Sequence, residues 1–160
     1  ATVQIDFQVP ERFELEYIDK DGSRKRPVVI HRAMLGSFER FIGILLEHLN
    51  GALPLWLSPE QIWIIPIASR HNKYARICGE LFSAGFSAGN LRVAVKDESE
   101  TVGKKIREGE VQKIPYLLVV GEKEEKAKSV SVRQRGKGDL GQMGIDEFLK
   151  KVKKENAERA

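Results

Sequence analysis

The sequence of 160 residues predicts an α/β fold, a mixed sheet flanked by helices that is preceded by antiparallel strands. Residues 62–67 form a nearly continuous apolar run, which is typical of a strand covered on both faces. Apolar or small residues then recur at helical spacing over residues 73–84, before another apolar run at 91–96. Residues 2–9 alternate apolar and polar side chains, as half-buried antiparallel strands do. Alternating strands and helices favour an α/β domain after the N-terminal strands.

The bulk properties are those of a globular protein, because 41% apolar residues suffice for a packed core. The net charge of +4 permits nucleic-acid binding without demonstrating it. The one cysteine, Cys78, has no partner for an internal disulfide, so we expect a reducing, cytoplasmic location. No apolar run approaches the roughly 18 residues that span a bilayer, and no membrane partner is expected. The chain begins within a strand pattern and without Met, which predicts a fragment.

Residues 1–50 are expected to contain three antiparallel strands and one helix. The alternation over residues 2–9 is repeated by Phe13, Leu15 and Tyr17, and residues 19–23 supply turn chemistry. A β-branched run over residues 28–30 predicts the third strand. This is too little chain to enclose an active site.

A helix is predicted to follow Gly36 and Ser37, because large apolar residues then recur at spacings of three and four. They are Phe38, Phe41, Ile42, Leu45, Leu46 and Leu49. Ser37 can cap this helix, Gly36 permits a tight turn, and Glu39 suits the positively polarised first turn. A guanidinium at this junction, Arg40, could bind a phosphate. Alternatively, Glu39 and Arg40 are the solvated face of an amphipathic helix.

Helix-breaking residues over 51–59 predict a short linker between a first part, 1–50, and a second domain, 60–160. The second domain is expected to have the order βαβαββα. The predicted strands are 62–67, 91–96, 116–120 and 130–135, and the predicted helices are 73–84, 100–113 and 146–157.

Residues 30–43, IHRAMLGSFERFIG, closely resemble the third signature motif of class II aminoacyl-tRNA synthetases in its threonyl version. The second domain is similar over its whole length to the anticodon-binding domain of the threonyl, prolyl, glycyl and histidyl synthetases. The matching segments are 102–108, 113–124 and 130–133, followed by 139–141. The resemblance therefore implies the C-terminal portion of a threonyl-tRNA synthetase, with the end of the catalytic domain and the anticodon-binding domain.

For the first part, the resemblance implies an ATP and aminoacyl-adenylate pocket. Thr2, Gln4 and Ser37 match residues that line it, and Arg40 matches the catalytic arginine that packs on adenine and contacts the ATP phosphates. Thr2 and Gln4 share one strand face, so both could reach into a cleft. His31 matches a histidine that ligates Zn²⁺, whereas without that match an ordinary strand histidine is the favoured interpretation.

A Zn²⁺ site that leaves room for substrate needs two further His or Cys ligands beside His31. His48, His71 and Cys78 do not fall at positions where the family supplies them. We expect those ligands and the first two class II motifs upstream of Ala1, so that this chain alone is inactive. In the intact homodimeric enzyme, ATP with Mg²⁺, threonine and threonine tRNA would be the substrates.

For the second domain, the resemblance implies that Arg107, Glu124 and Arg133 contact anticodon bases. Arginine donates to base-edge acceptors and a carboxylate accepts from amines, which suits this role. Ser99 stands where the family has an asparagine, which puts that contact in doubt. The loop at 84–90 is also longer than is usual in the family. Further basic residues are read either as phosphate contacts or as solvated charges: Lys104, Lys105, Lys113, Arg135 and Lys137.

The sequence thus predicts a threonine–tRNA ligase fragment that recognises the anticodon. The alternative is a non-catalytic RNA-binding or regulatory protein that retains the anticodon-binding fold. The joint presence of Thr2, Gln4, His31, Ser37 and Arg40 argues against such a degenerate protein. A third possibility is a partner-binding module unrelated to RNA. The fragment itself is expected to be monomeric or weakly associated, with exposed strand edges.

Overall fold

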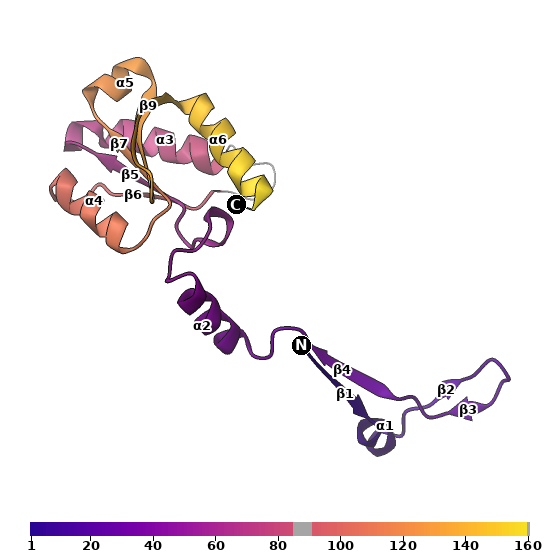
Figure 1. The fold of residues 1–160 in the computed structure, drawn as a ribbon. Coiled ribbons are helices and arrows are strands. Elements are labelled where there is room, and N and C mark those ends of the chain that lie inside the picture. The colour runs from indigo at the N-terminus through magenta and orange to yellow at the C-terminus, as the bar shows by residue number, and fades with distance from the viewer. Residues whose placement is uncertain (85–90, 160) are drawn as a thin grey trace. The chain divides into compact units, whose positions relative to one another are not determined.

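The computed structural model describes residues 1–84 and 91–159. The chain separates into two compact units, Ala1–Asn50 and Gly51–Ala160 (Figure 1). The loop that the sequence marks as unusually long, apart from Ala84, lies outside the described residues. Within the described part of the chain, no helix is long and apolar enough to cross a membrane.

The first unit is built on a two-stranded antiparallel ribbon of β1 (Thr2–Asp6) and β4 (Val29–Ala33). The predicted first strand is too long, because α1 (Gln8–Arg12) replaces its end. The Asp6 carboxylate accepts hydrogen bonds from the backbone N–H groups of Gln8 and Val9, which stabilises the start of this helix. The predicted strand at residues 13–17 is also wrong, since only β2 (Tyr17–Ile18) pairs, with β3 (Arg24–Lys25).

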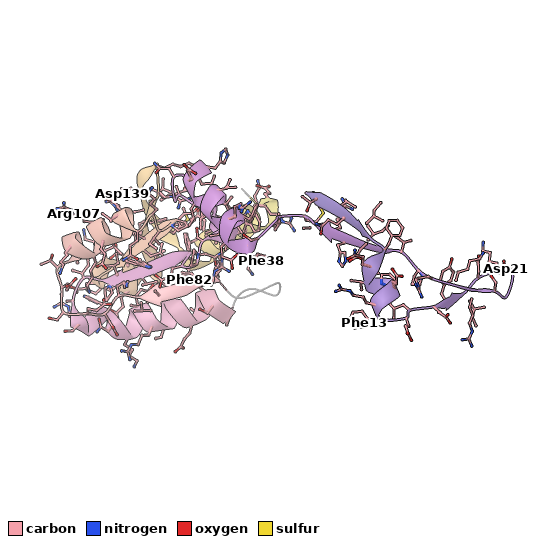
Figure 2. The ribbon with its side chains drawn as sticks, turned by 90° about the horizontal axis from the view of Figure 1, so that it is seen from below. Phe13, Asp21, Phe38, Phe82, Arg107 and Asp139 are labelled. Atoms are coloured by element: carbon pink, nitrogen blue, oxygen red, sulfur yellow. The ribbon has the colours of Figure 1, made fainter. Side chains whose placement is uncertain are left out.

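The predicted helix after Ser37 is confirmed as α2 (Phe38–His48). The Ser37 hydroxyl accepts a hydrogen bond from the Arg40 backbone N–H at 3.3 Å, and Gly36 has a φ of +71°. However, α2 buries none of its residues, all of which are described, and Phe38 is 73% exposed (Figure 2). The apolar side chains of β1 are exposed as well, so the expected half-burial is wrong. A two-stranded ribbon needs a second layer to bury its face, and the described elements of this unit supply none.

The second unit contains the predicted mixed sheet, in the strand order β6-β5-β7-β8-β9. β5 (Ile62–Pro66) is parallel to β6 (Val93–Val95) and β7 (Tyr116–Val120). β8 (Ser129–Gln134) is antiparallel to β7 and to β9 (Gly138–Gly144). The α/β fold class is therefore confirmed.

Helices cover both faces of this sheet (Figure 1). One face of β5, with Ile62 and Ile64, packs in a cluster with residues of α3 (Asn72–Ala84) and α6 (Ile145–Glu158). The other face, with Trp63 and Ile65, packs against α4 (Val102–Val111). All five residues of β5 are buried, as its continuous apolar pattern predicts.

Two elements of the second unit were not predicted, β9 and α5 (Glu122–Ala127). The remaining short elements are two 3-10 helices, η1 (Leu55–Leu57) and η2 (Ser69–His71). Residues 51–59, expected to be a linker, fall in the second unit, where η1 contacts α6 and Leu55 is buried. The domain boundaries themselves stay a prediction.

The N-terminus of α4 gives a first testable prediction. The Thr101 hydroxyl accepts a hydrogen bond from the Lys104 backbone N–H at 3.3 Å and caps the helix. Thr101→Ala is therefore expected to lower the free energy of unfolding by about 1 kcal/mol. Thr101→Ser keeps the hydroxyl and should retain most of that stability. Urea unfolding measures both variants, and equal midpoints for all three proteins would show that this cap contributes nothing.

Candidate nucleic-acid interface

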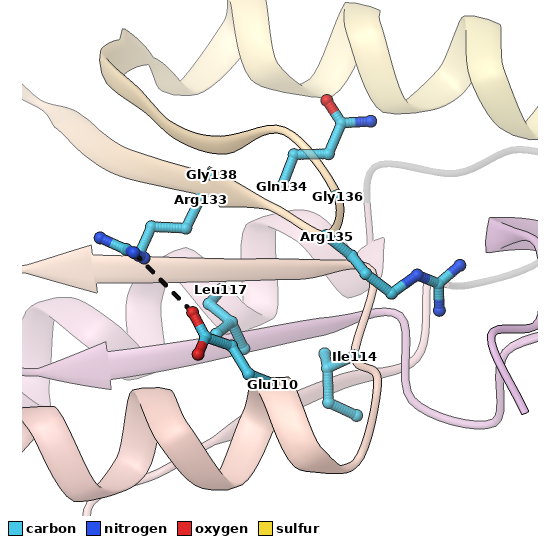
Figure 3. A pocket seen from close by; sticks show the side chains of 8 residues that line it. All are labelled: Glu110, Ile114, Leu117, Arg133, Gln134, Arg135, Gly136 and Gly138. Carbon is cyan, nitrogen blue, oxygen red and sulfur yellow. Dashed lines mark ion pairs between the residues drawn. The ribbon is translucent and has the colours of Figure 1, made fainter.

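A cavity of about 250 Å³ lies beside the C-terminal end of α4 and the turn between β8 and β9 (Figure 3). Its lining combines aliphatic, charged and glycine residues. They are Glu110, Ile114, Leu117, Arg133, Gln134, Arg135, Gly136 and Gly138. Ile114 and Leu117 are buried and form an apolar floor, while Glu110 is exposed. The cavity thus joins an apolar surface to charged groups, as ligand pockets commonly do.

Arg133, one of the predicted anticodon contacts, lies on β8 opposite Leu117 of β7. The pairing of β8 with β9 shifts between Val132 and Arg133, and this irregularity brings Asp139 opposite Arg133. Arg133 Nη1 lies 3.5 Å from Asp139 Oδ2, and Arg133 Nη2 lies 3.8 Å from Glu110 Oε1. Arg133 Nε is buried and has no hydrogen-bond partner among the described residues. The guanidinium therefore keeps donor capacity for a ligand.

Arg107, the second predicted contact, is exposed on α4 and precedes Glu110 by three residues. Residues three apart on a helix are neighbours on its surface, so Arg107 and Glu110 share one face of α4. Glu110 also pairs with Arg133, so the two predicted arginines lie on neighbouring elements, α4 and β8. Sequence reasoning missed Glu110, although its spacing from Arg107 was a usable signal.

Glu124, the third predicted contact, lies in the first turn of α5, after the end of β7. Its carboxylate accepts a hydrogen bond from the Gly121 backbone N–H at 3.0 Å and thereby caps its own helix. Arg133 pairs with Leu117 near the start of β7, whereas Glu124 follows the end of that strand. The structure therefore does not bring Glu124 to the cavity that Arg133 lines.

Ser99 lies between β6 and α4 and lines a different, polar crevice of about 360 Å³. This crevice follows the carboxyl ends of β5 and β6, where open α/β sheets commonly bind ligands. Lys105, which also lines it, is buried and donates a hydrogen bond to the Lys96 carbonyl oxygen at 2.7 Å. Lys105 and Arg135 both bind backbone carbonyls, so neither is the free surface cation that a phosphate contact would need.

Among the predicted residues of the first unit, Arg40 lies on α2, and Ser37 is the residue that caps this helix. Thr2, Gln4 and His31 lie on β1 and β4, where Gln4 pairs directly with His31. His31 Nε2 is 3.2 Å from a carboxylate oxygen of Asp6. Hydrogen bonds from the backbone, chiefly from Val9, hold the pKa of Asp6 below its ordinary value.

The donor set for Zn²⁺ is incomplete in the described part of this chain. No group of three His, Cys, Asp or Glu side chains lies close enough there to hold a metal ion. His31 has only the Asp6 carboxylate beside it, and a structural or catalytic Zn²⁺ needs at least three protein ligands. The residues present do not fit a complete Zn²⁺ site, and no chemical step is assigned to this metal.

Comparison with known families identifies the chain. Residues 61–155 match the model described as anticodon binding domain, and residues 1–49 match the tRNA synthetase class II core domain (G, H, P, S and T). The chain belongs to the anticodon binding domain family. The resemblance to threonyl-tRNA synthetases that the sequence motifs predict is confirmed by the relatives described next.

The threonine–tRNA ligase of Carboxydothermus hydrogenoformans is 52% identical over 99% of this chain and 24% of the relative. That of Syntrophomonas wolfei is 52% identical over 97% of this chain and 24% of the relative. The solved RNA binding domain of threonyl-tRNA synthetase from Cryptosporidium parvum matches with a TM-score of 0.77 and 38% identity, covering 96% of this chain and 38% of that one. The chain therefore spans about a quarter of the length of these curated relatives.

Proposed function

We propose that this chain is the C-terminal portion of a threonine–tRNA ligase and that its second unit recognises the anticodon of threonine tRNA. The observation that carries the proposal is the Arg133 guanidinium beside an apolar cavity, with a buried Nε that lacks a partner among the described residues. It lies in the segment that matches the anticodon binding domain. Relatives of about 50% identity over nearly the whole chain are threonine–tRNA ligases.

The chemistry of the second unit suits an unpaired RNA loop. Single-stranded bases are read by hydrogen bonds to their edges and by stacking on flat side chains, including the arginine fork. Arg133 would donate to a base, and the exposed Arg107 on the neighbouring helix would contact a second base or a phosphate. Glu124 and Ser99 lie apart from the cavity, so any contact they make would engage a different part of the loop.

The first unit would contribute to the chemistry of the intact ligase, which activates threonine with ATP and transfers it to tRNA. In this proposal Arg40 binds the ATP phosphates, and Thr2, Gln4 and Ser37 line the adenylate pocket. His31 would supply one of several Zn²⁺ ligands, and Mg²⁺ would accompany ATP. We further propose that the intact enzyme is a cytoplasmic homodimer. These roles rest on the family resemblance, since this chain spans about a quarter of its relatives.

Binding to the anticodon stem-loop of threonine tRNA tests the proposal. We expect the chain to lose about 1–3 kcal/mol of binding free energy when single anticodon bases are altered. Arg133→Ala and Arg107→Ala should each weaken binding to the native stem-loop and reduce this discrimination. Arg24→Ala removes the same charge from the exposed β2–β3 hairpin of the first unit and serves as the matched control.

Two results would contradict this function in different ways. Equal affinity for native and altered stem-loops would leave a basic RNA-binding surface that does not read sequence, as in a regulatory protein that retains the fold. Binding that is almost independent of salt would argue against RNA altogether, because phosphate contacts release counterions and weaken as salt rises.

A further inference from the structure

The ion pairs of Arg133 at the cavity are long, so its guanidinium can bind a ligand. The Arg133 guanidinium lies 3.8 Å from the Glu110 carboxylate (Figure 3) and 3.5 Å from that of Asp139, and both distances are at or beyond the limit of ordinary hydrogen-bond length. Both carboxylate partners are exposed, and long ion pairs to exposed carboxylates contribute little to stability. A buried nitrogen without a partner, such as Arg133 Nε, is costly and is usually satisfied by a ligand or by water. These side chains can therefore exchange partners with a ligand at low cost.

The shape of the cavity favours a flat ligand. Its floor is the aliphatic pair Ile114 and Leu117, and its wall is the backbone of the β8–β9 turn. In that turn, Gly136 and Gly138 have φ values of 77° and 76°, a conformation that side-chain-bearing residues rarely adopt. Because no side chain projects from either position, the wall stays open next to the charged groups. A single unstacked nucleobase has the apolar faces and polar edge that such a cavity requires.

Arginine alone cannot read a whole Watson–Crick base edge, because its guanidinium only donates hydrogen bonds. The Watson–Crick edge of every unpaired base presents donors beside acceptors, so complete readout of that edge needs an acceptor next to the arginine. Glu110 supplies a carboxylate at this position, and it is 60% exposed while Arg133 is 32% exposed. Both side chains therefore combine partial solvent access with a place on the cavity lining.

We propose that Glu110 determines base specificity at this cavity. Its carboxylate positions the Arg133 fork and accepts hydrogen bonds from the amine or ring N–H of one unstacked base. This inference rests on the proposed anticodon recognition and adds to it an acceptor that the family resemblance does not assign. Asp139 of β9 pairs with the other terminal nitrogen of the guanidinium, Nη1.

The competing explanation is that Glu110 merely lowers the local positive charge. Removing its charge would then strengthen binding to every RNA by the same factor, since phosphate attraction is independent of sequence. A positioning and reading role instead predicts an effect on one anticodon position alone. Base preference is therefore the informative measurement, and overall affinity is not.

The experiment compares Glu110→Gln with Glu108→Gln, which removes the same charge from an exposed site on the same helix. Each variant is titrated with the native anticodon stem-loop and with stem-loops altered at one anticodon base at a time. We expect Glu110→Gln to reduce discrimination between bases at one anticodon position by about tenfold. At the other anticodon positions, Glu110→Gln and Glu108→Gln should discriminate equally well. Arg133→Lys, which retains charge but loses the fork, should reduce discrimination at that same position.

The outcomes separate this inference from the proposed function. If the unmodified chain discriminates between anticodons and both glutamine variants discriminate equally well, Glu110 has no reading role and the inference is overturned. If the unmodified chain does not discriminate at all, the anticodon proposal fails and the inference fails with it. Thermal unfolding of both variants excludes a folding defect as the cause of any difference.

Discussion

Phe148→Ala is expected to lower the free energy of unfolding of the second unit by about 3–5 kcal/mol. Phe148 is fully buried, and its ring meets those of Phe82 and Tyr116 edge to face, at centroid distances of 5.4 and 5.3 Å. Alanine would leave a cavity between α3, α6 and β7 and would remove both aromatic contacts. A domain of this size has about 5–15 kcal/mol of stability in total, so the variant is expected to be marginally folded.

Urea unfolding followed by circular dichroism checks this prediction. Phe13→Ala is the matched control, because Phe13 is 72% exposed in the first unit (Figure 2). It should change the stability of the second unit by less than about 0.5 kcal/mol. Phe148→Leu, which refills most of the space, should fall between the two. If Phe148→Ala and Phe13→Ala had the same unfolding midpoint, the aromatic cluster would not be the centre of the core.

The fold of the second unit was largely predictable, because its core elements carry strong local patterns. β5 is a continuous apolar run, and α3 carries a clear helical stripe. In contrast, α5 has the sequence EKEEKA, without any large apolar residue, and it forms where the Glu124 carboxylate caps it. β9 contains three glycines and no alternation, and its pairing with β8 makes it a strand. Elements that depend on such contacts with the rest of the domain cannot be predicted from the local sequence pattern.

In the first unit, local sequence patterns predict the structure poorly. Its apolar alternation correctly predicts β1, but one side chain, Asp6, redirects the following residues into α1. Alternation also predicts burial, yet burial depends on whether another layer is available to cover the apolar face. β1 and α2 carry apolar side chains in the pattern of buried elements, but no other element in the described part of this unit covers them.

The candidate site could be predicted only in part, and for a geometric reason. Resemblance selects Arg107, Arg133, Glu124 and Ser99 one by one, but it does not say which of them lie together. That depends on the register of β7 with β8 and on the irregular pairing of β8 with β9. Only the structure shows that Arg133 pairs with Glu110, on the same helix as Arg107, and that Glu124 and Ser99 lie elsewhere.

Arg135 illustrates a basic residue whose role the sequence did not reveal. It was read as a phosphate contact or a solvated charge, but its guanidinium donates to the backbone carbonyls of Lys113, Ala52 and Leu53. Burial lowers the pKa of Arg135 from its ordinary value. Arg135 thus links residues 52–53 to the loop before β7. Residues 52–53 directly follow Asn50 and Gly51, which both have positive φ.

Arg135→Met is therefore expected to lower the free energy of unfolding of the second unit by about 2–3 kcal/mol. Methionine keeps much of the aliphatic volume but leaves three carbonyl groups without their charged donor. The exposed Arg24, paired with Glu16, provides the control, since Arg24→Met should cost no more than about 1 kcal/mol.

Hydrogen exchange locates the effect. The amides of Leu57 and Ser58 donate to the Pro54 carbonyl, and they should exchange faster in Arg135→Met as the preceding residues loosen. Amides within β5 exchange only when the whole domain unfolds, so their exchange rates should change only as much as the global free energy of unfolding of the variant requires. If the Leu57 and Ser58 amides were unaffected, the segment would be held by the bonds of Arg92 to Trp56 and Ser58 instead. Arg135 would then not stabilise the position of residues 52–53 in this domain.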